Sequence, residues 1–301
     1  MSVIKVEQLT KDYGFNRGVF DVSFEVQQGE VFGFLGPNGA GKTTTIRHIM
    51  GFSRPQVGKT SVNGLDSWTQ HDIIQRDVGY LPGEIALPEY LTGTEFINMM
   101  AELRGMKDMS YTNKLVEQFE LDATGGLKRM SLGTKRKLAV VTAFMHDPAV
   151  LVLDEPTSGL DPVMQDIFIQ FVKEEKQRGK TILLSSHIFT EIDATCDRIS
   201  IIKDGRLVST FVANELRYSD RKEWKIEFAT SEEFTRFKEN TKFVISSVKP
   251  KYNQALVVVY DQQVNEFVTE LSNYSIHFFS EIKFTLEDYF MEFYDRNKEV
   301  Q

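Results

Sequence analysis

The sequence contains the phosphate-binding pattern G-x-x-x-x-G-K-[ST] at residues 36–43, GPNGAGKT. The apolar run EVFGFL before it is typical of a buried strand, and TTTIRHIM after it has helical spacing. In such a loop the glycines let backbone N–H groups face the phosphates, Lys42 would reach the β- and γ-phosphates, and the Thr43 hydroxyl would bind Mg²⁺. A flexible glycine-rich turn is the alternative, but it would leave the flanking strand and helix unexplained. The pattern predicts a site for ATP or a similar nucleotide with Mg²⁺.

Two adjacent carboxylates, Asp154 and Glu155, end a second apolar run, LVLDEP. Neighbouring residues on a strand point to opposite faces, so the two carboxylates can serve different features of one site. Asp154 would hold Mg²⁺ through water, and Glu155 would polarise the attacking water. A solvated pair at a strand end is the alternative. The phosphate-binding loop in the same chain favours hydrolysis.

The elements that must position these residues alternate along the chain. Residues 2–35 predict strands, residues 43–51 a helix, and residues 93–105, 110–120 and 131–146 three further helices. AVLVLDE and KTILLSSH are nearly uncharged and rich in β-formers, and RISIIKDGRLV predicts a strand pair that turns at Asp204 and Gly205. Strands that are apolar on both faces and alternate with helices indicate an α/β fold with a parallel sheet.

A second domain is expected after about residue 215, because 301 residues exceed one average domain. The predicted order is strand 224–229, helix 231–240, strands 243–248 and 255–260, helix 262–273 and strand 275–281. This βαββαβ order is ferredoxin-like, and a helix at about 285–295 follows it. We therefore expect an ATPase domain at 1–215 and a small α+β accessory domain at 216–301.

Further motifs in series narrow the class of protein. Tyr13 lies in LTKDYG, Ser131 and Gly133 lie in MSLGTKRKLA, residues 158–161 read SGLD, and His187 follows TILLSS. Ser131 precedes Asp154 by 23 residues, and His187 follows it by 33. With these motifs, approximately residues 3–215 resemble the nucleotide-binding subunits of ABC transporters. The resemblance implies a P-loop ABC ATPase domain with a mixed sheet, an N-terminal antiparallel β subdomain and a helical subdomain at about 84–146.

The resemblance also implies roles for individual residues. In a head-to-tail dimer, Ser131 and the Gly133 N–H of one subunit would contact the γ-phosphate bound by the other, and Asp161 would help link the two sites. Without the resemblance, Tyr13 would be interpreted as a half-buried strand residue and His187 as a histidine at a strand end. The resemblance implies instead that Tyr13 stacks on the adenine and that His187 contacts the γ-phosphate. The candidate catalytic residues are Glu155, His187 and Lys42. The candidate ATP-binding residues are Tyr13, Gly36, Pro37, Asn38, Gly39, Ala40, Gly41, Lys42, Thr43, Thr44, Ser131, Gly133 and Asp161, and the candidate Mg²⁺ ligands are Thr43, Asp154 and Glu84.

The sequence departs from the family pattern at two places. Gly83 stands where the family has a glutamine that contacts Mg²⁺ and the attacking water, so either Glu84 substitutes for it or the metal relies more on Thr43 and Asp154. In the signature motif, residues 132 and 134 are Leu and Thr in place of the usual Gly and Gln. Lys135 and Arg136, on the same helix, are expected to form a solvated face.

The composition of the chain and its last residues indicate which partners and which cellular location to expect. A net charge of −8 disfavours nucleic acid as the main partner, and no apolar run approaches the length of a membrane span. The ending FTLEDYFMEFY resembles that of ATPase subunits of bacterial exporters for drugs, peptides and lipids. We expect a cytoplasmic subunit, peripheral on the inner face of the cell membrane, that forms a homodimer or heterodimer and drives export through a separate membrane-spanning permease.

Other functions remain open alternatives to this one. A regulatory or soluble ABC ATPase with weak or no coupling to transport is the first. ABC ATPases that act on ribosomes or DNA usually carry two cassettes or a long coiled-coil insertion, and neither is found in this sequence. A P-loop GTPase or kinase is disfavoured because no N-K-x-D motif occurs and because the signature motif would remain unexplained.

Overall fold

The computed structural model describes residues 1–217, 220–282 and 285–295. The chain divides into two compact units, Met1–Ala213 and Asn214–Gln301, and this division lies two residues before the expected boundary. Within the described residues, no helix is long and apolar enough to cross a membrane.

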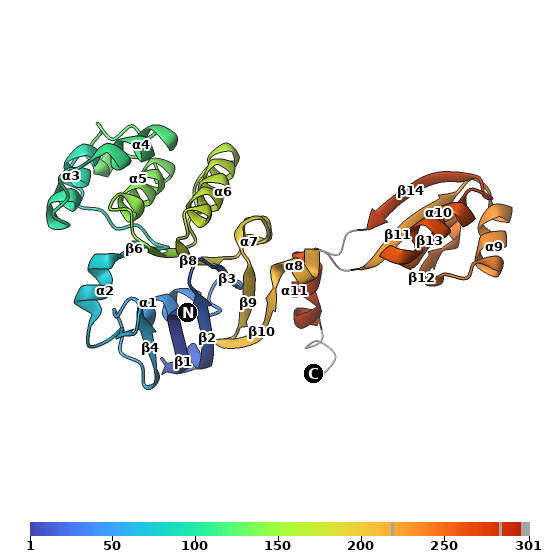
Figure 1. The fold of residues 1–301 in the computed structure, drawn as a ribbon, viewed down its shortest axis with the longest axis horizontal. Coiled ribbons are helices and arrows are strands. Elements are labelled where there is room, and N and C mark those ends of the chain that lie inside the picture. The colour runs from blue at the N-terminus through green and yellow to red at the C-terminus, as the bar shows by residue number, and fades with distance from the viewer. Residues whose placement is uncertain (218–219, 283–284, 296–301) are drawn as a thin grey trace. The chain divides into compact units, whose positions relative to one another are not determined.

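The main sheet of the first unit has six strands in the order β10-β9-β3-β8-β7-β6. Five of them run parallel, and β10 pairs with β9 antiparallel across the predicted turn. Every residue of β3, β7 and β8 is buried, as expected for strands covered on both faces. The neighbouring strands β3 and β8 are labelled side by side in Figure 1. The strands are β3 (Val31–Leu35), β6 (Val78–Leu81), β7 (Val150–Asp154), β8 (Thr181–Ser186), β9 (Arg198–Lys203) and β10 (Arg206–Val212).

A second, antiparallel sheet in this unit has the order β2-β1-β4-β5. Its buried side chains share one hydrophobic core with β3, β7 and the first helix of the unit. At the junction of the two sheets, the Phe24 and Phe32 rings stack with their centroids 5.1 Å apart. The strands are β1 (Ser2–Asp12), β2 (Gly18–Gln27), β4 (Val57–Val62) and β5 (Leu65–Asp66), and the helices α1 (Lys42–Ile49) and α2 (His71–Asp77) connect this sheet with the main one.

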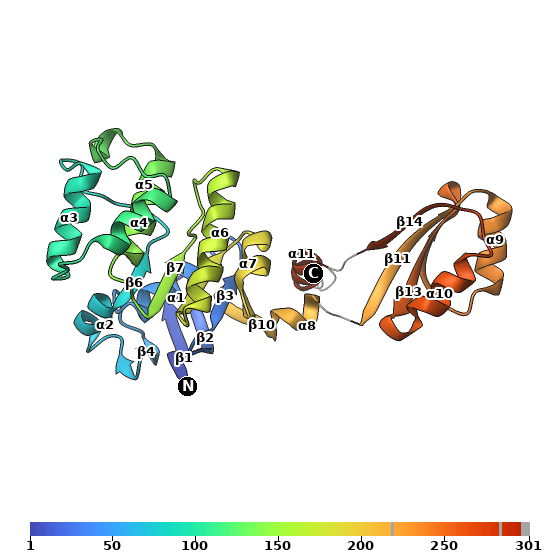
Figure 2. The same ribbon diagram turned by 45° about the horizontal axis from the view of Figure 1, so that its top comes forward.

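Three helices between β6 and β7 form the predicted helical region, and they lie together in Figure 2. They are α3 (Gly93–Leu103), α4 (Ser110–Gln118) and α5 (Leu132–Phe144), with the 3₁₀ turn η1 (Leu127–Arg129) before α5. Thr92 and Glu95 form a capping box at the start of α3. The Phe171 ring packs 4.8 Å from Phe144 and 5.2 Å from Phe119, which joins this region to α6 (Pro162–Gln177). The helix α7 (Phe189–Thr195) follows β8.

The second unit contains a four-stranded antiparallel sheet in the order β12-β13-β11-β14. With one helix after its first strand and another after its third, this is the predicted ferredoxin-like topology. Phe228, Phe237 and Phe267 lie in its own hydrophobic core. The elements are β11 (Arg221–Phe228), α9 (Ser231–Asn240), β12 (Val244–Lys249), η2 (Pro250–Tyr252), β13 (Gln254–Tyr260), η3 (Asp261–Gln263), α10 (Val264–Leu271) and β14 (Ile276–Ile282). The helix α8 (Ala213–Arg217) precedes β11, and α11 (Leu286–Asp295) follows β14.

Candidate active site

The loop of residues 36–43 connects β3 to α1 in a conformation that requires glycine. Gly41, the N-cap of α1, has φ of +112°, where a side chain is strained. A Cβ at Gly36 would lie 2.5 Å from the Ile202 carbonyl oxygen. In this described part of the chain, the N–H groups of Gly41, Lys42, Thr43 and Thr44 donate to no backbone carbonyl. Unpaired donors at a helix N-terminus form an anion-binding site, so the loop fits a bound phosphate.

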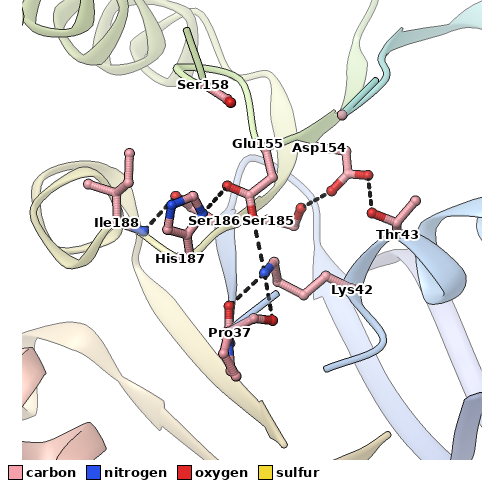
Figure 3. Close-up of polar contacts among 12 residues, drawn as sticks. Pro37, Lys42, Thr43, Asp154, Glu155, Ser158, Ser185, Ser186, His187 and Ile188 are labelled. Atoms are coloured by element: carbon pink, nitrogen blue, oxygen red, sulfur yellow. Dashed lines mark hydrogen bonds and ion pairs between the residues drawn. The ribbon is translucent and has the colours of Figure 1, made fainter. Parts of the chain in front are cut away.

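Lys42 extends back along this loop and is 95% buried, that is, only 5% exposed. Its Nζ donates to the Gly36 carbonyl at 2.6 Å and to the Pro37 carbonyl at 3.2 Å, and it lies 2.9 Å from Glu155 Oε1 (Figure 3). The loop therefore brings its only side-chain cation against the candidate catalytic carboxylate. A charge so placed can serve both the phosphates and Glu155.

Asp154 ends β7 and is fully buried. The Thr43 hydroxyl donates to Asp154 Oδ2 at 2.6 Å, and the Ser185 hydroxyl donates to Asp154 Oδ1 (Figure 3). A carboxylate and a hydroxyl are oxygen donors of the kind that Mg²⁺ takes when it also binds substrate phosphates and water. The pair Thr43 and Asp154 therefore fits a Mg²⁺ site beside the phosphate loop.

Glu155 follows β7 with φ of +49°, a left-handed conformation that costs a non-glycine residue roughly 1–3 kcal/mol. Its N–H donates to the Ser185 carbonyl at 2.9 Å, which holds the strand end in place. Its two carboxylate oxygens contact different partners: Oε1 lies by Lys42, and Oε2 lies 2.6 Å from His187 Nδ1 (Figure 3). The structure therefore brings Glu155, Lys42 and His187, which were named from three separate motifs, into one group.

The loop after β6 also approaches Asp154. A Cβ at Gly83 would lie 3.0 Å from Asp154 Oδ2, so glycine leaves this carboxylate unobstructed. Glu84 is exposed and, in the described structure, forms no hydrogen bond or ion pair with Asp154 or Thr43. The contacts thus favour Thr43 and Asp154 over Glu84 as metal ligands.

The signature residues begin α5 and lie next to the SGLD segment. The Ser131 hydroxyl caps the helix by accepting from Thr134 N–H at 3.1 Å, and a Cβ at Gly133 would lie 3.1 Å from the Gly159 carbonyl oxygen. Asp161 caps α6 through Met164 N–H at 3.0 Å. Both caps are exposed, and no hydrogen bond among the described residues links them to the phosphate loop of their own chain. They are accessible to another molecule.

Tyr13 lies in the turn between β1 and β2, and its side chain is 56% exposed. Its N–H donates to the Arg17 carbonyl at 2.8 Å, and Lys11 Nζ lies 5.8 Å from its ring centroid. The start of β2 approaches the phosphate loop, since a Cβ at Gly41 would lie 2.7 Å from Val19 Cγ1. An exposed aromatic ring on this hairpin is suited to stacking on a base.

Two buried charged residues were not predicted for the site. Arg136 was expected on a solvated face, and this prediction is wrong: the residue is only 3% exposed and donates to three backbone carbonyls. The helical pattern of the sequence could not reveal its burial, because the residues that accept these hydrogen bonds are distant in sequence. Lys135 is half-buried. Glu191 is 1% exposed, and burial raises its pKa to about 7, an effect that nearby Ser186, Thr157 and Arg136 offset only in part.

The fold and this site define a P-loop ATPase, and comparisons with known proteins narrow the class. The family model described as ABC transporter matches residues 19–158, and a model of an AAA domain matches residues 125–193. An uncharacterized ABC transporter ATP-binding protein of Methanocaldococcus jannaschii is 37% identical over 213 residues, which are 68% of this chain and 76% of the relative. The bacitracin transport ATP-binding protein BcrA of Bacillus licheniformis is 34% identical over 77% of this chain and 76% of its own length.

A solved structure described as the ATP binding subunit of an ABC transporter is also similar. It is 32% identical and superposes with a TM-score of 0.66 over 72% of this chain and 92% of its own. The chain belongs to the family of ABC transporter ATP-binding proteins. It is therefore an ATP-binding subunit, and its enzymatic class is that of an ATPase.

Proposed function

We propose that this chain hydrolyses ATP with Mg²⁺ at the interface of a head-to-tail dimer. The observation that carries the proposal is the position of Glu155 between Lys42 and His187, beside an Asp154 bonded to Thr43. Glu155 is placed to orient and polarise a water molecule, and Lys42 to stabilise charge on the transferred phosphate. His187 holds the second Glu155 oxygen and is 45% exposed, so it can also reach the γ-phosphate.

Mg²⁺ held by Thr43 and Asp154 would neutralise negative charge on the phosphates. The residues named from the sequence divide into two groups in this account. One group surrounds the phosphates of the chain's own ATP, namely the loop of residues 36–44 with Glu155 and His187, and Tyr13 would stack on the adenine. The other group, Ser131, Gly133 and Asp161, faces outward at helix N-termini and would contact ATP held by a second subunit.

Hydrolysis in this account drives a separate membrane-spanning permease, in the direction of export. The name of one relative supports the direction: a 34% identical Rhizobium etli protein is a Nod factor export ATP-binding protein. The name of BcrA, a bacitracin transport ATP-binding protein, supports transport. The subunit would then act in the cytoplasm, peripheral to the inner face of the membrane, as one half of a homodimer or heterodimer.

The test compares two substitutions in the purified chain. Glu155→Gln keeps the shape of the side chain but not its charge, so we expect ATP affinity by calorimetry to persist while hydrolysis falls by a factor of roughly 10² or more. Lys42→Ala removes the buried cation of the phosphate loop, so tight ATP binding should be lost. Unchanged ATP affinity in Lys42→Ala, or full hydrolysis by Glu155→Gln, would refute these roles.

A further inference from the structure

Arg136 joins three segments of the first unit through one buried guanidinium. It lies on α5, five residues after the helix cap Ser131. Its Nη1 donates to the Pro82 carbonyl at 2.9 Å, its Nη2 to the Gly83 carbonyl at 2.7 Å, and its Nε to the Ser158 carbonyl at 2.9 Å. Hydrogen bonds from a charged donor are stronger than those between neutral groups, so Arg136 holds α5, the Pro82–Gly83 loop and Ser158 together.

Each acceptor belongs to a segment that contacts a carboxylate of the active site. Gly83 lies beside Asp154, where a Cβ would be 3.0 Å from Oδ2. Ser158 is tied to Glu155, because the Ser158 N–H donates to the Glu155 carbonyl at 3.1 Å. A movement of α5 would therefore be transmitted through Arg136 toward both Asp154 and Glu155.

Only arginine suits this position. Its planar guanidinium carries five donors in a fixed fork, whereas a lysine ammonium is a point donor that cannot reach the adjacent Pro82 and Gly83 carbonyls and the distant Ser158 carbonyl in the same way. Burial lowers the pKa of the Arg136 guanidinium, and the nearby carboxylates of Asp154, Glu155 and Glu191 offset this lowering in part by favouring its charged form. Its hydrogen bonds all go to backbone, so it is not itself placed to touch the nucleotide.

We propose that Arg136 is the positioning residue that couples the two ATP sites of the dimer. Ser131 and Gly133, at the start of the same helix, contact the partner's ATP in the proposed function, on which this inference rests. Arg136 links that contact to the Pro82–Gly83 loop and to Ser158, and so to Asp154 and Glu155 of its own site. Engagement of one site thereby sets the geometry of the other.

The test uses Arg136→Lys, which keeps the charge and loses the fork, with Arg136→Met as a second variant. Arg104→Lys is a matched control, because Arg104 is also partly buried and donates to a backbone carbonyl, that of Arg76, outside the site. The full-length chains are assayed for ATP affinity, for kcat and for the Hill coefficient of hydrolysis. We expect Arg136→Lys to bind ATP within about threefold of wild type, to lose about tenfold in kcat, and to lower the Hill coefficient to about 1.

Two results would overturn the inference. One is a wild-type Hill coefficient retained in Arg136→Lys. The other is a parallel loss of melting temperature and ATP affinity with no change in cooperativity, which a merely structural role would produce. If Arg136→Met does not fold, Arg136→Lys decides the question. A failure of the proposed function itself would be seen in a different experiment. If the ATP-bound dimer does not form, the Glu155→Gln variant, in which Arg136 is unchanged, would remain a monomer in the presence of ATP.

Discussion

Glu155 and Asp154 are adjacent in sequence but are held by different groups. Asp154 accepts from Thr43 and Ser185, while Glu155 contacts Lys42 and His187. The left-handed backbone at Glu155 contributes to this separation, since it turns the chain out of β7 immediately after Asp154. One strand end can therefore supply a metal ligand and a catalytic carboxylate that do not compete for the same partners.

We predict that Gly83 affects the binding of Mg²⁺ rather than the binding of the nucleotide. In Gly83→Ala, the new Cβ would crowd Asp154 Oδ2, and Asp154 cannot move freely because Thr43 and Ser185 hold it. We expect the Mg²⁺ concentration for half-maximal hydrolysis to rise about tenfold, the lower end of the roughly 10–100-fold effect seen when the support of a metal ligand is disturbed, because Asp154 itself is kept. A titration of ATPase activity with Mg²⁺ measures this.

Gly125→Ala is the control for this experiment, because a Cβ at Gly125 would meet nothing within 4 Å. It should leave the Mg²⁺ titration unchanged. An identical titration curve for Gly83→Ala and wild type would show that Asp154 does not depend on the free space at residue 83.

Glu191 is predicted to make stability depend on pH. Its folded-state pKa of about 7 lies above the usual 4.5, so its stabilising contribution is complete below pH 4.5 and is lost as the pH rises through 7. Between pH 5 and pH 8 it should lower the free energy of unfolding by about 2–3 kcal/mol. The Glu191→Gln variant has no titrating group at this position, so its free energy of unfolding should fall less between pH 5 and pH 8. The free energy of unfolding is measured by urea denaturation at each pH. If it changes with pH equally in wild type and in Glu191→Gln, the Glu191 carboxyl is not buried in its protonated form.

At the scale of elements, the helix α5 combines a structural cap with an outward-facing site. Ser131 accepts from Thr134 N–H, and such a cap contributes about 1 kcal/mol. Ser131→Asp separates the two roles, since aspartate also caps helices but would repel a phosphate. We expect the melting temperature to stay the same or to rise, while ATP hydrolysis falls at least tenfold by loss of the contact across the dimer. Wild-type hydrolysis by Ser131→Asp would place the partner's phosphate elsewhere.

Much of this arrangement could be predicted from the sequence, because local patterns determine it. The loop at residues 36–43, the strand ending in Asp154 and Glu155, and the three helices of the helical region all have strong local signals, and the ferredoxin-like order follows from alternating short segments. The position of Arg136 could not be predicted in this way. Its three acceptors lie 22, 53 and 54 residues away, and only the packed fold brings their carbonyls together.

At the scale of the whole molecule, the described residues of the two units contribute to separate hydrophobic cores. Buried side chains of β1, β2, β3 and α1 belong to one core, and those of β11, β13 and α10 belong to the other. The active site is built entirely within the first unit, Met1–Ala213. Ser131, Gly133 and Asp161, however, would take part in catalysis only if a second subunit supplied the ATP, so the proposed hydrolysis needs two chains rather than one.

Sedimentation of the full-length Glu155→Gln chain, with and without saturating MgATP, measures this pairing of two chains. We expect ATP to convert the 34.5 kDa chain into a species of twice that mass and Ser131→Asp in the same background to prevent the conversion. These results would support the head-to-tail dimer. A chain that binds ATP tightly and still sediments as a monomer would contradict it.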